Sequence, residues 1–283
     1  QDRPTQLYVI PIFGRPFLPA QILPVQIQAD PWRKTIERVA NTPHKMVALF
    51  RISDEKERDP DTPLPDITPT TGCAVRILHA SSGDGELQFV AEGIERVEIV
   101  NWLSHKPPYL VEVRYPPVKL AEGRSDTEIK AYAMALISAI KELLPINPLY
   151  SEELKQYLDR FNPNDPSPLA DCAAAITTAS GDELQEILDT PLVYERLQKS
   201  LALVKKEIEV AKLHNQIRDE VNRSINERQR EFFLREQLKV IQRELGLEKD
   251  DKTAEIETFS KRMAERTVPD LVQQRLEEEL GKL

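Results

Sequence analysis

One stretch without helix-breaking residues, between Pro191 and Gly246, constrains this fold more than any other feature of the sequence. Its 54 intervening residues contain neither glycine nor proline. Thr190-Pro191 suits a helix start, and Gly246 suits a helix end. A single helix of this length would be about 80 Å long, so much of it would project from a small domain. Two shorter helices folded back on each other are the alternative. Because no breaker is present to form the turn, we predict a single helix.

Apolar residues recur along this predicted helix in two seams with alternating spacings of four and three. The first seam comprises Leu197, Leu201, Val204, Ile208 and Ala211, and the second comprises Leu234, Leu238, Ile241 and Leu245. This spacing is typical of a surface packed against another helix, so both seams are candidates for helix packing or oligomer contacts. Residues 215–230 between them are mostly polar, with Ile217, Val221 and Ile225 at steps of four. The polar middle predicts a strut that crosses solvent.

The first 120 residues are predicted to be mainly β-strands, because short runs rich in β-branched and aromatic residues alternate with turn residues. The predicted strands are Leu7–Ile10, Val25–Gln28, Met46–Phe50, Ala74–Leu78, Leu87–Val90 and Tyr109–Val113. Ser82-Gly83-Asp84-Gly85 predicts a hairpin turn. One helix interrupts the strands, where Asp30-Pro31 leads into residues 32–40. Residues 54–69 are acidic and rich in proline, which predicts an exposed, mobile loop.

The pattern becomes helical from Ser125, which forms a predicted capping box with Glu128. Shorter helices are expected from Ser151, from Ser167-Pro168 and from Asp182. After a hinge at residues 248–253, helices are expected at 254–266 and 269–280. Charge also changes along the chain: residues 121–190 carry 5 basic and 13 acidic groups, whereas residues 191–246 carry 12 and 9. These patterns predict an α+β chain with a β-rich domain at 1–120, a helical subdomain at 121–190, the long helix at 191–246 and linker helices at 247–283.

Several classes of function are disfavoured by composition and spacing. Nine glycines and no phosphate-loop or dinucleotide pattern argue against a nucleotide-binding enzyme. The four histidines and the two cysteines show no spacing for a metal or a catalytic nucleophile, so no catalytic, cofactor-binding or metal-binding residue is assigned. Cys73 and Cys172 fit a reducing compartment better than a disulfide framework. The net charge of −9 argues against nucleic acid, and no apolar run reaches the ~18 residues of a membrane span. We expect a chain that binds a partner and catalyses nothing by itself.

Three groups of residues resemble the N-terminal region of the Lon family of ATP-dependent proteases. The similar segments are Ile10–Val25, Ala91–Val97 and, on the long helix, Arg196–Lys199, Lys205–Glu209 and Gln229–Gly246. The first is an apolar run that carries prolines, the second is similar to a Glu-Gly-Leu-x-Arg strand of the family, and the third is the most specific. Ala20 stands where many relatives have glycine, and Phe13 stands where many have arginine. The resemblance covers roughly residues 7–283.

The resemblance implies a fold and a place in a larger protein. The fold is a PUA-like pseudo-barrel, the LON domain, followed by a helical bundle and a long helix that leads to an ATPase ring. The chain would be an N-terminal fragment, to be followed in a whole serine endopeptidase by an ATPase module, with its ATP and Mg²⁺, and by a Ser-Lys protease domain. The resemblance also implies a bacterial cytoplasmic protein, with the mitochondrial matrix or the peroxisome as alternatives.

The function implied by the resemblance is recognition of unfolded, damaged or degron-bearing proteins, together with support of a homo-hexamer and delivery to the ATPase pore. Candidate substrate-binding residues are Phe17, Leu18 and Ile22 in the entry segment and Phe232 and Phe233 on the long helix. The alternative for each group is burial in the core or in helix packing. A purely structural oligomerisation scaffold is the second function. RNA binding is a third, disfavoured by the 14 basic and 15 acidic groups of residues 1–120.

Overall fold

The computed structural model describes residues 3–52, 63–83, 85–120, 123, 125–146, 158, 161–162, 165–245, 257–262, 272 and 275. The strands are β1 (Gln6–Phe13), β2 (Ile22–Gln28), β3 (Met46–Ile52), β4 (Thr71–Gly83), β5 (Glu86–Ser104) and β6 (Leu110–Arg114). The helices are α1 (Ala29–Ala40), α2 (Leu64–Ile67), α3 (Asp126–Leu143), α5 (Ser167–Ala175), α6 (Gly181–Asp189) and α7 (Val193–Glu244). The chain forms two compact units, of which the first extends to Asn215 and the second begins at Gln216.

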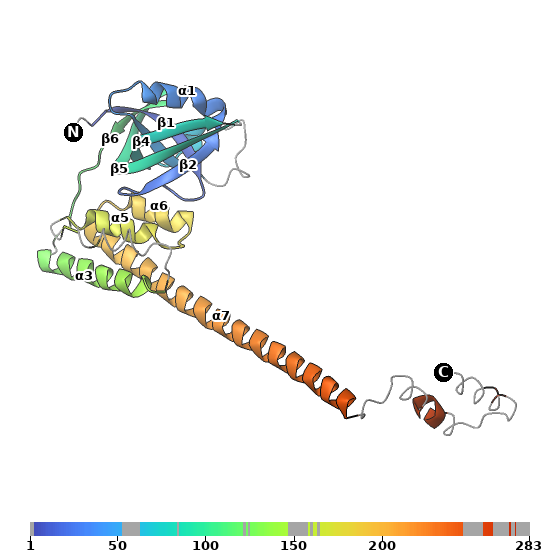
Figure 1. Ribbon diagram of the computed structural model, residues 1–283. Helices are drawn as coiled ribbons and strands as arrows, with labels where there is room; N and C mark the ends of the chain where they lie inside the picture. Colours follow the sequence, from blue (N-terminus) through green and yellow to red (C-terminus); the bar gives the residue numbers. More distant parts are fainter. Residues whose placement is uncertain are drawn as a thin grey trace. The chain divides into compact units, whose positions relative to one another are not determined.

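The six strands form one sheet in the order β2-β5-β4-β3-β1-β6, and β6 pairs again with β5. This second pairing closes the sheet into a barrel-like ring, which leaves β2 attached to the first half of β5 (Figure 1). β1 and β3 run parallel, and the other pairings are antiparallel. The predicted α+β class with an N-terminal pseudo-barrel is therefore confirmed. We call β1–β6, α1 and α2 the β domain.

The barrel interior is a single apolar core to which all six strands contribute. Inward-facing residues such as Val9, Val47 and Val111 are completely buried. Helix α1 contributes Trp32, whose ring centroid lies 6.0 Å from that of Tyr109. Asp30 has extended dihedral angles (φ −95°, ψ 131°), so regular helix begins at the following proline, as the sequence predicts.

The predicted loop at residues 54–69 needs a partial correction. Residues 54–62 lie outside the described residues. Residues 64–67 form the short helix α2, and Leu64 is buried in the barrel core instead of exposed. The sequence pattern missed this because a single apolar side chain between prolines gives no periodicity.

The helical subdomain consists of α3, α5, α6 and the first part of α7, and it has its own apolar cluster. The predicted capping box of Ser125 and Glu128 is present at α3, and Ser180 and Glu183 form a second one at α6. The helices predicted at 167 and 182 are α5 and α6. The helix predicted from Ser151 lies outside the described residues except for one helical position, Leu158.

Helix α7 is continuous for 52 residues, from Val193 to Glu244. The single-helix prediction is confirmed, and the alternative of two helices folded back near residue 220 is wrong. Its first seam is buried in the subdomain except for the half-buried Ala211, whereas the side chains of α7 beyond Gln216 are exposed within this chain. In the predicted tail helix 254–266, residues 257–262 are helical; most of 269–280 lies outside the described residues.

Candidate functional site

The predicted site residues fall into two structural groups. Phe17 is buried in the barrel core, and Leu18 is buried in a small cluster with α5 and α6, so the core alternative describes both. Ile22 is exposed on β2. Phe232 and Phe233 are both exposed on α7, with 67% and 61% of their surface accessible in this chain.

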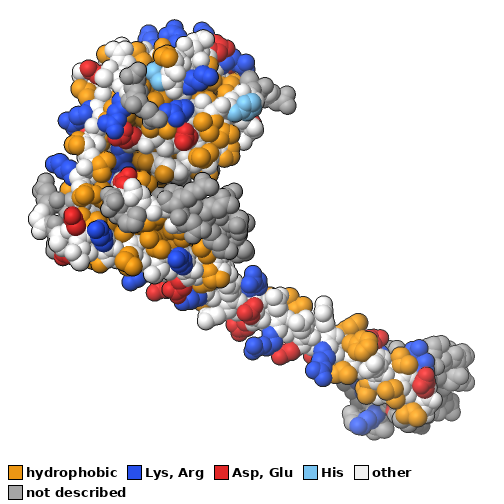
Figure 2. Space-filling model, turned by 60° about the vertical axis from the view of Figure 1, so that its left-hand side comes forward, with side chains coloured by type: hydrophobic (Ala, Val, Ile, Leu, Met, Phe, Trp, Pro, Cys, Tyr) orange, Lys and Arg blue, Asp and Glu red, His pale blue; other side chains and the backbone are white. Residues whose placement is uncertain are grey.

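The two seams of α7 also differ. The first seam packs inside the helical subdomain against α3 and α5; its buried members are Leu197, Leu201, Val204 and Ile208. The second seam is more than half exposed and meets no partner among the described residues; its members are Leu234, Leu238, Ile241 and Leu245. Figure 2 shows hydrophobic side chains gathered on the visible face of this part of α7. A helix with such spacing and no covering layer offers an apolar surface to a polypeptide or to another helix.

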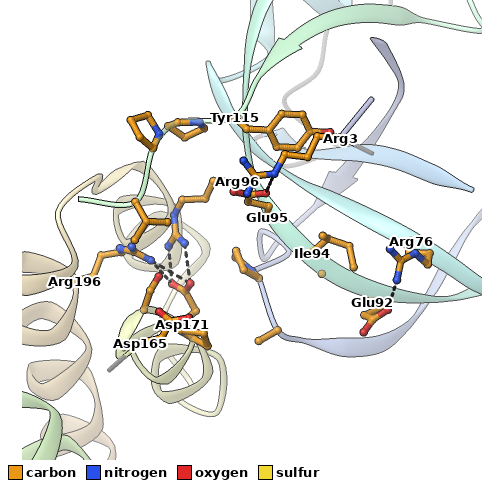
Figure 3. Close-up of a pocket in the computed structure, with 18 of the residues that line it drawn as sticks. Arg3, Arg76, Glu92, Ile94, Glu95, Arg96, Tyr115, Asp165, Asp171 and Arg196 are labelled. Atoms are coloured by element: carbon orange, nitrogen blue, oxygen red, sulfur yellow. Dashed lines mark hydrogen bonds and ion pairs between the residues drawn. The ribbon is translucent and has the colours of Figure 1, made fainter. Parts of the chain in front are cut away.

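A cavity of about 980 Å³ lies in the first unit, between the β domain and the helical subdomain. One wall comes from β5 and from the segment that follows β6, which carries Tyr115, Pro116 and Pro117. The opposite wall comes from the start of α5 and from Arg196 on α7. Figure 3 shows these side chains facing one another across the space. Its volume lies within the range of ligand-binding pockets.

Arg96 and Arg196 share the carboxylate of Asp171 at the base of this cavity; we call these three residues the central ion network. Arg96 donates from Nη1 and Nη2 to the two carboxylate oxygens at 2.7 and 2.5 Å. Arg196 donates from Nη1 to the same two oxygens at 3.1 and 3.3 Å. All three side chains are buried. The network therefore ties β5, α5 and α7 together.

The electrostatics of the two arginines differ. Burial opposes the charged form of Arg96, but the charge and hydrogen bonds of Asp171 outweigh burial, so the pKa of Arg96 is raised. Arg96 also donates to the carbonyl oxygens of Leu188 and Ile187 at the end of α6, where a cation is favourable. For Arg196, burial and the nearby Arg96 together outweigh Asp171, so its pKa is lowered. Arg196 is thus the less well compensated cation.

The rim of the cavity carries two further ion pairs. Arg3 pairs with Glu95 at 3.0 Å, and Arg76 pairs with Glu92 at 3.4 Å. Burial raises the pKa of Glu95, and Arg3 partly offsets this effect. Tyr115 donates its hydroxyl to the carbonyl oxygen of Pro4, and burial followed by the charge of Glu95 raises its pKa to about 12.

More contacts join the β domain to the helical subdomain near the cavity. Arg15 donates to the carbonyl oxygens of Ala175 and Thr177, and Arg51 pairs with Asp182 at 2.7 Å. Gly181 allows α6 to approach the β domain closely, because a Cβ at this position would collide with the carbonyl oxygen of Gly14. These contacts join the β domain and the helical subdomain within one compact unit.

The sequence patterns missed the central ion network and the cavity. Arg96, Asp171 and Arg196 are far apart in the chain. Both arginines lie in segments that resemble the Lon family, but this resemblance does not indicate that they become buried. Pro116 and Pro117 line the cavity, but in the sequence two consecutive prolines indicate only that strand pairing stops there. Among the described residues, no group of histidine, cysteine or acidic side chains could hold a metal ion. None of the described helices has the length and apolarity needed to cross a bilayer.

Comparison with known proteins agrees with this architecture. The family model described as the ATP-dependent protease La (LON) substrate-binding domain matches residues 6–206. Lon protease 2 of Hydrogenovibrio crunogenus is 41% identical over 282 residues, which cover 100% of this chain and 32% of that protein. Lon protease of Magnetococcus marinus is 40% identical over 284 residues, which cover 99% of this chain and 34% of that protein.

The chain thus spans about a third of the length of these curated relatives. Among solved structures, the N-terminal domain of Lon protease from Mycobacterium avium complex matches with a TM-score of 0.54 and 21% identity, covering 71% of this chain and 98% of that one. This match supports the fold. Because the family model covers most of the chain, from β1 into α7, the chain belongs to the LON substrate-binding domain family of ATP-dependent protease La.

Proposed function

We propose that this chain recognises unfolded, damaged or degron-bearing polypeptides for an ATP-dependent Lon protease and catalyses no reaction itself. On this proposal ATP, Mg²⁺ and the Ser-Lys protease chemistry belong to other modules of the whole serine endopeptidase, which acts in the bacterial cytoplasm. Membership of a family named for substrate binding supports the proposal. The single observation that carries it is the exposed pair Phe232 and Phe233 on α7.

The physical basis is the cost of leaving two aromatic side chains in water. Neighbouring helical residues point about 100° apart, so this pair presents apolar surface over a wide sector of α7. Phenylalanine burial is worth about 1.5–3 kcal/mol per side chain relative to exposure. An unfolded polypeptide exposes the apolar segments that would cover such a surface, whereas a folded protein hides them.

The test is the double substitution Phe232→Ser and Phe233→Ser. We expect weaker binding of an unfolded model protein, measured by fluorescence anisotropy, with an unchanged helical circular-dichroism signal. Met134→Ser is the control, because Met134 is an exposed apolar residue on a different helix. Unchanged binding by the double variant would remove Phe232 and Phe233 from the proposed contact surface.

Assembly of a hexamer is the second function that we propose. The alternative is a purely structural oligomerisation scaffold, in which the chain assembles subunits and does not select substrates. The second seam of α7 supports it, because apolar residues at spacings of four and three favour helix pairing. Leu238→Lys with Ile241→Lys should lower the sedimentation coefficient of any oligomer that the chain forms. If the wild-type chain forms an oligomer but ignores unfolded proteins, the scaffold is favoured over substrate recognition.

A further inference from the structure

The exposed part of α7, residues 216–244, carries apolar side chains on two opposite sides. Successive helical residues turn by about 100°, so four of these side chains share a sector of about 80°. They are Ile217, Val221, Ile225 and Phe232, and each is about half exposed or more. The second seam lies on the opposite side of the helix, roughly 160–220° around the axis from Ile225. The first four residues therefore form an apolar surface that is separate from the second seam.

Charge divides this part of α7 along the same line. The half of the helix that is centred on Ile225 carries five basic residues and one acidic residue; they are Arg218, Arg228, Arg235, Lys239, Arg243 and Glu236. The other half carries two basic and five acidic residues; they are Arg223, Arg230, Asp219, Glu220, Glu227, Glu231 and Glu244. All of these side chains are exposed. We call the first half, with its apolar side chains, the basic face.

Ion pairs along the helix neutralise only part of the basic face. Arg235 pairs with Glu231 at 2.6 Å, and Lys239 pairs with Glu236 at 3.1 Å. Both pairs are exposed, so each is weak and an incoming carboxylate can compete for the cation. Among the residues that the structure describes, Arg218 and Arg228 have no ion-pair partner. The basic face therefore keeps a positive potential in a chain whose net charge is −9.

This combination of charge and apolar surface selects the ligand. A polyanion without apolar groups would leave the apolar side chains in water, and a basic segment would be repelled. Ile217, Val221 and Ile225 follow one another in steps of four, which forms a ridge oblique to the helix axis. A flexible segment can follow such a ridge, whereas the alternating steps of the second seam suit a helix that runs alongside α7.

We propose that the basic face binds apolar polypeptide segments that are flanked by aspartate or glutamate, and that it disfavours those flanked by lysine or arginine. This proposal rests on the proposed function of polypeptide recognition, to which Phe232 belongs, and adds a charge preference to it. Substrate contact and subunit assembly then use opposite sides of one helix.

The experiment uses the whole 283-residue chain and three labelled peptides with the same apolar core, flanked on both sides by glutamate, glutamine or lysine. Fluorescence anisotropy at pH 7 measures binding, with the glutamates and lysines charged. We expect the glutamate peptide to bind at least about fivefold more tightly than the lysine peptide, because several weak ion pairs act together. Added salt should reduce this difference. Equal affinities, or tighter binding of the lysine peptide, would overturn the proposal.

The net charge of −9 makes this a stringent test, because non-specific attraction to the whole chain would favour the lysine peptide. The observed order of affinities therefore distinguishes the basic face from the average surface of the chain. A poly-glutamate peptide of the same charge should bind more weakly than the glutamate-flanked apolar peptide. Equal binding of these two peptides would contradict an apolar contribution.

Charge reversal on α7 locates the preference. Arg218→Glu with Arg228→Glu should abolish the preference for the glutamate peptide. Arg223→Glu with Arg230→Glu is the matched control, because it makes the same change of charge on the opposite half of the same helix. All four arginines are exposed, so both double variants should keep the helical circular-dichroism signal. Equal effects of the two double variants would contradict a site on the basic face.

Two further readouts separate the alternatives. If Arg218→Glu with Arg228→Glu dissociates an oligomer in sedimentation but leaves the peptide preference unchanged, a second copy of the chain occupies this face and the proposal fails. If the three peptides bind equally and Phe232→Ser with Phe233→Ser weakens all of them, the charge preference fails and the proposed function stands. If neither the peptides nor an unfolded model protein binds, both proposals fail.

Discussion

Asp171 holds two buried arginines with one carboxylate at the junction between the β domain and the helical subdomain. Arg96 reaches it from β5 and Arg196 reaches it from α7. Each of these side chains alone would be expected on a protein surface. Burial of all three is tolerated because Asp171 pairs with both guanidiniums, although Nε of Arg196 is buried without a hydrogen-bond partner among the described residues.

Asp171→Asn should lower the free energy of unfolding by about 3 kcal/mol or more, because it leaves two buried guanidiniums without a carboxylate. Asp182→Asn is the matched control: it also breaks an aspartate–arginine pair, but Asp182 is exposed, so the loss should stay below about 1 kcal/mol. Urea denaturation followed by circular dichroism measures both. Similar losses in the two variants would show that the central ion network is not specially stabilising.

The cysteines give a second residue-scale prediction. Burial and then the charge of Asp171 raise the pKa of Cys172 to about 12, and burial also raises the pKa of Cys73. A higher pKa leaves less thiolate at a given pH, so both thiols should react slowly in the native state. At pH 8 we expect Cys172 to react with a disulfide reagent about a thousandfold more slowly than an ordinary cysteine. Reaction at the ordinary rate before denaturant is added would contradict this burial.

At the scale of elements, α7 has two halves with the same spacing of apolar residues but different surroundings. The first seam is covered by α3 and α5, and Ser200 adds a buried hydrogen bond of 2.8 Å to the carbonyl oxygen of Ala170. The second seam is exposed within this chain. Similar local patterns therefore have different surroundings, and the neighbouring helices α3 and α5 cover only the first seam.

Leu197→Ala and Leu238→Ala form a matched pair on this one helix. The first empties a completely buried position and should lower the free energy of unfolding by about 2–5 kcal/mol. The second alters an exposed position and should change it by no more than about 0.5 kcal/mol when measured on dilute protein. A large loss for Leu238→Ala would mean that the second seam is covered, even in dilute solution.

The sequence predicted the elements with local signals best, whereas it predicted only Leu87–Val90 of the long strand β5. The length of α7 follows from the absence of glycine and proline, and the capping box at Ser125 is readable from two residues. It predicted their surroundings less well. Phe17 is buried in the barrel core, and Leu18 is buried against α5 and α6. Leu64 is buried by the short helix α2, which the sequence pattern does not predict.

At the scale of the whole molecule, the cavity and the central ion network arise only when distant segments meet. The β domain supplies Arg96, α5 supplies Asp171 and α7 supplies Arg196. Their separation in the chain is 75 residues for the first pair and 25 for the second. No local sequence pattern predicts contacts between residues so far apart in the chain. The family resemblance identified the fold as a whole, but it gave no information about which charged residues become buried.

Close packing at Gly181 limits which residues can replace it. A methyl group there would strike the carbonyl oxygen of Gly14 and the side chain of Arg51, so α6 would have to move away from the β domain. That movement would also separate Arg51 from Asp182. A library with every amino acid at this position should therefore return glycine among its stable members, whereas exposed positions such as Met134 should accept many replacements.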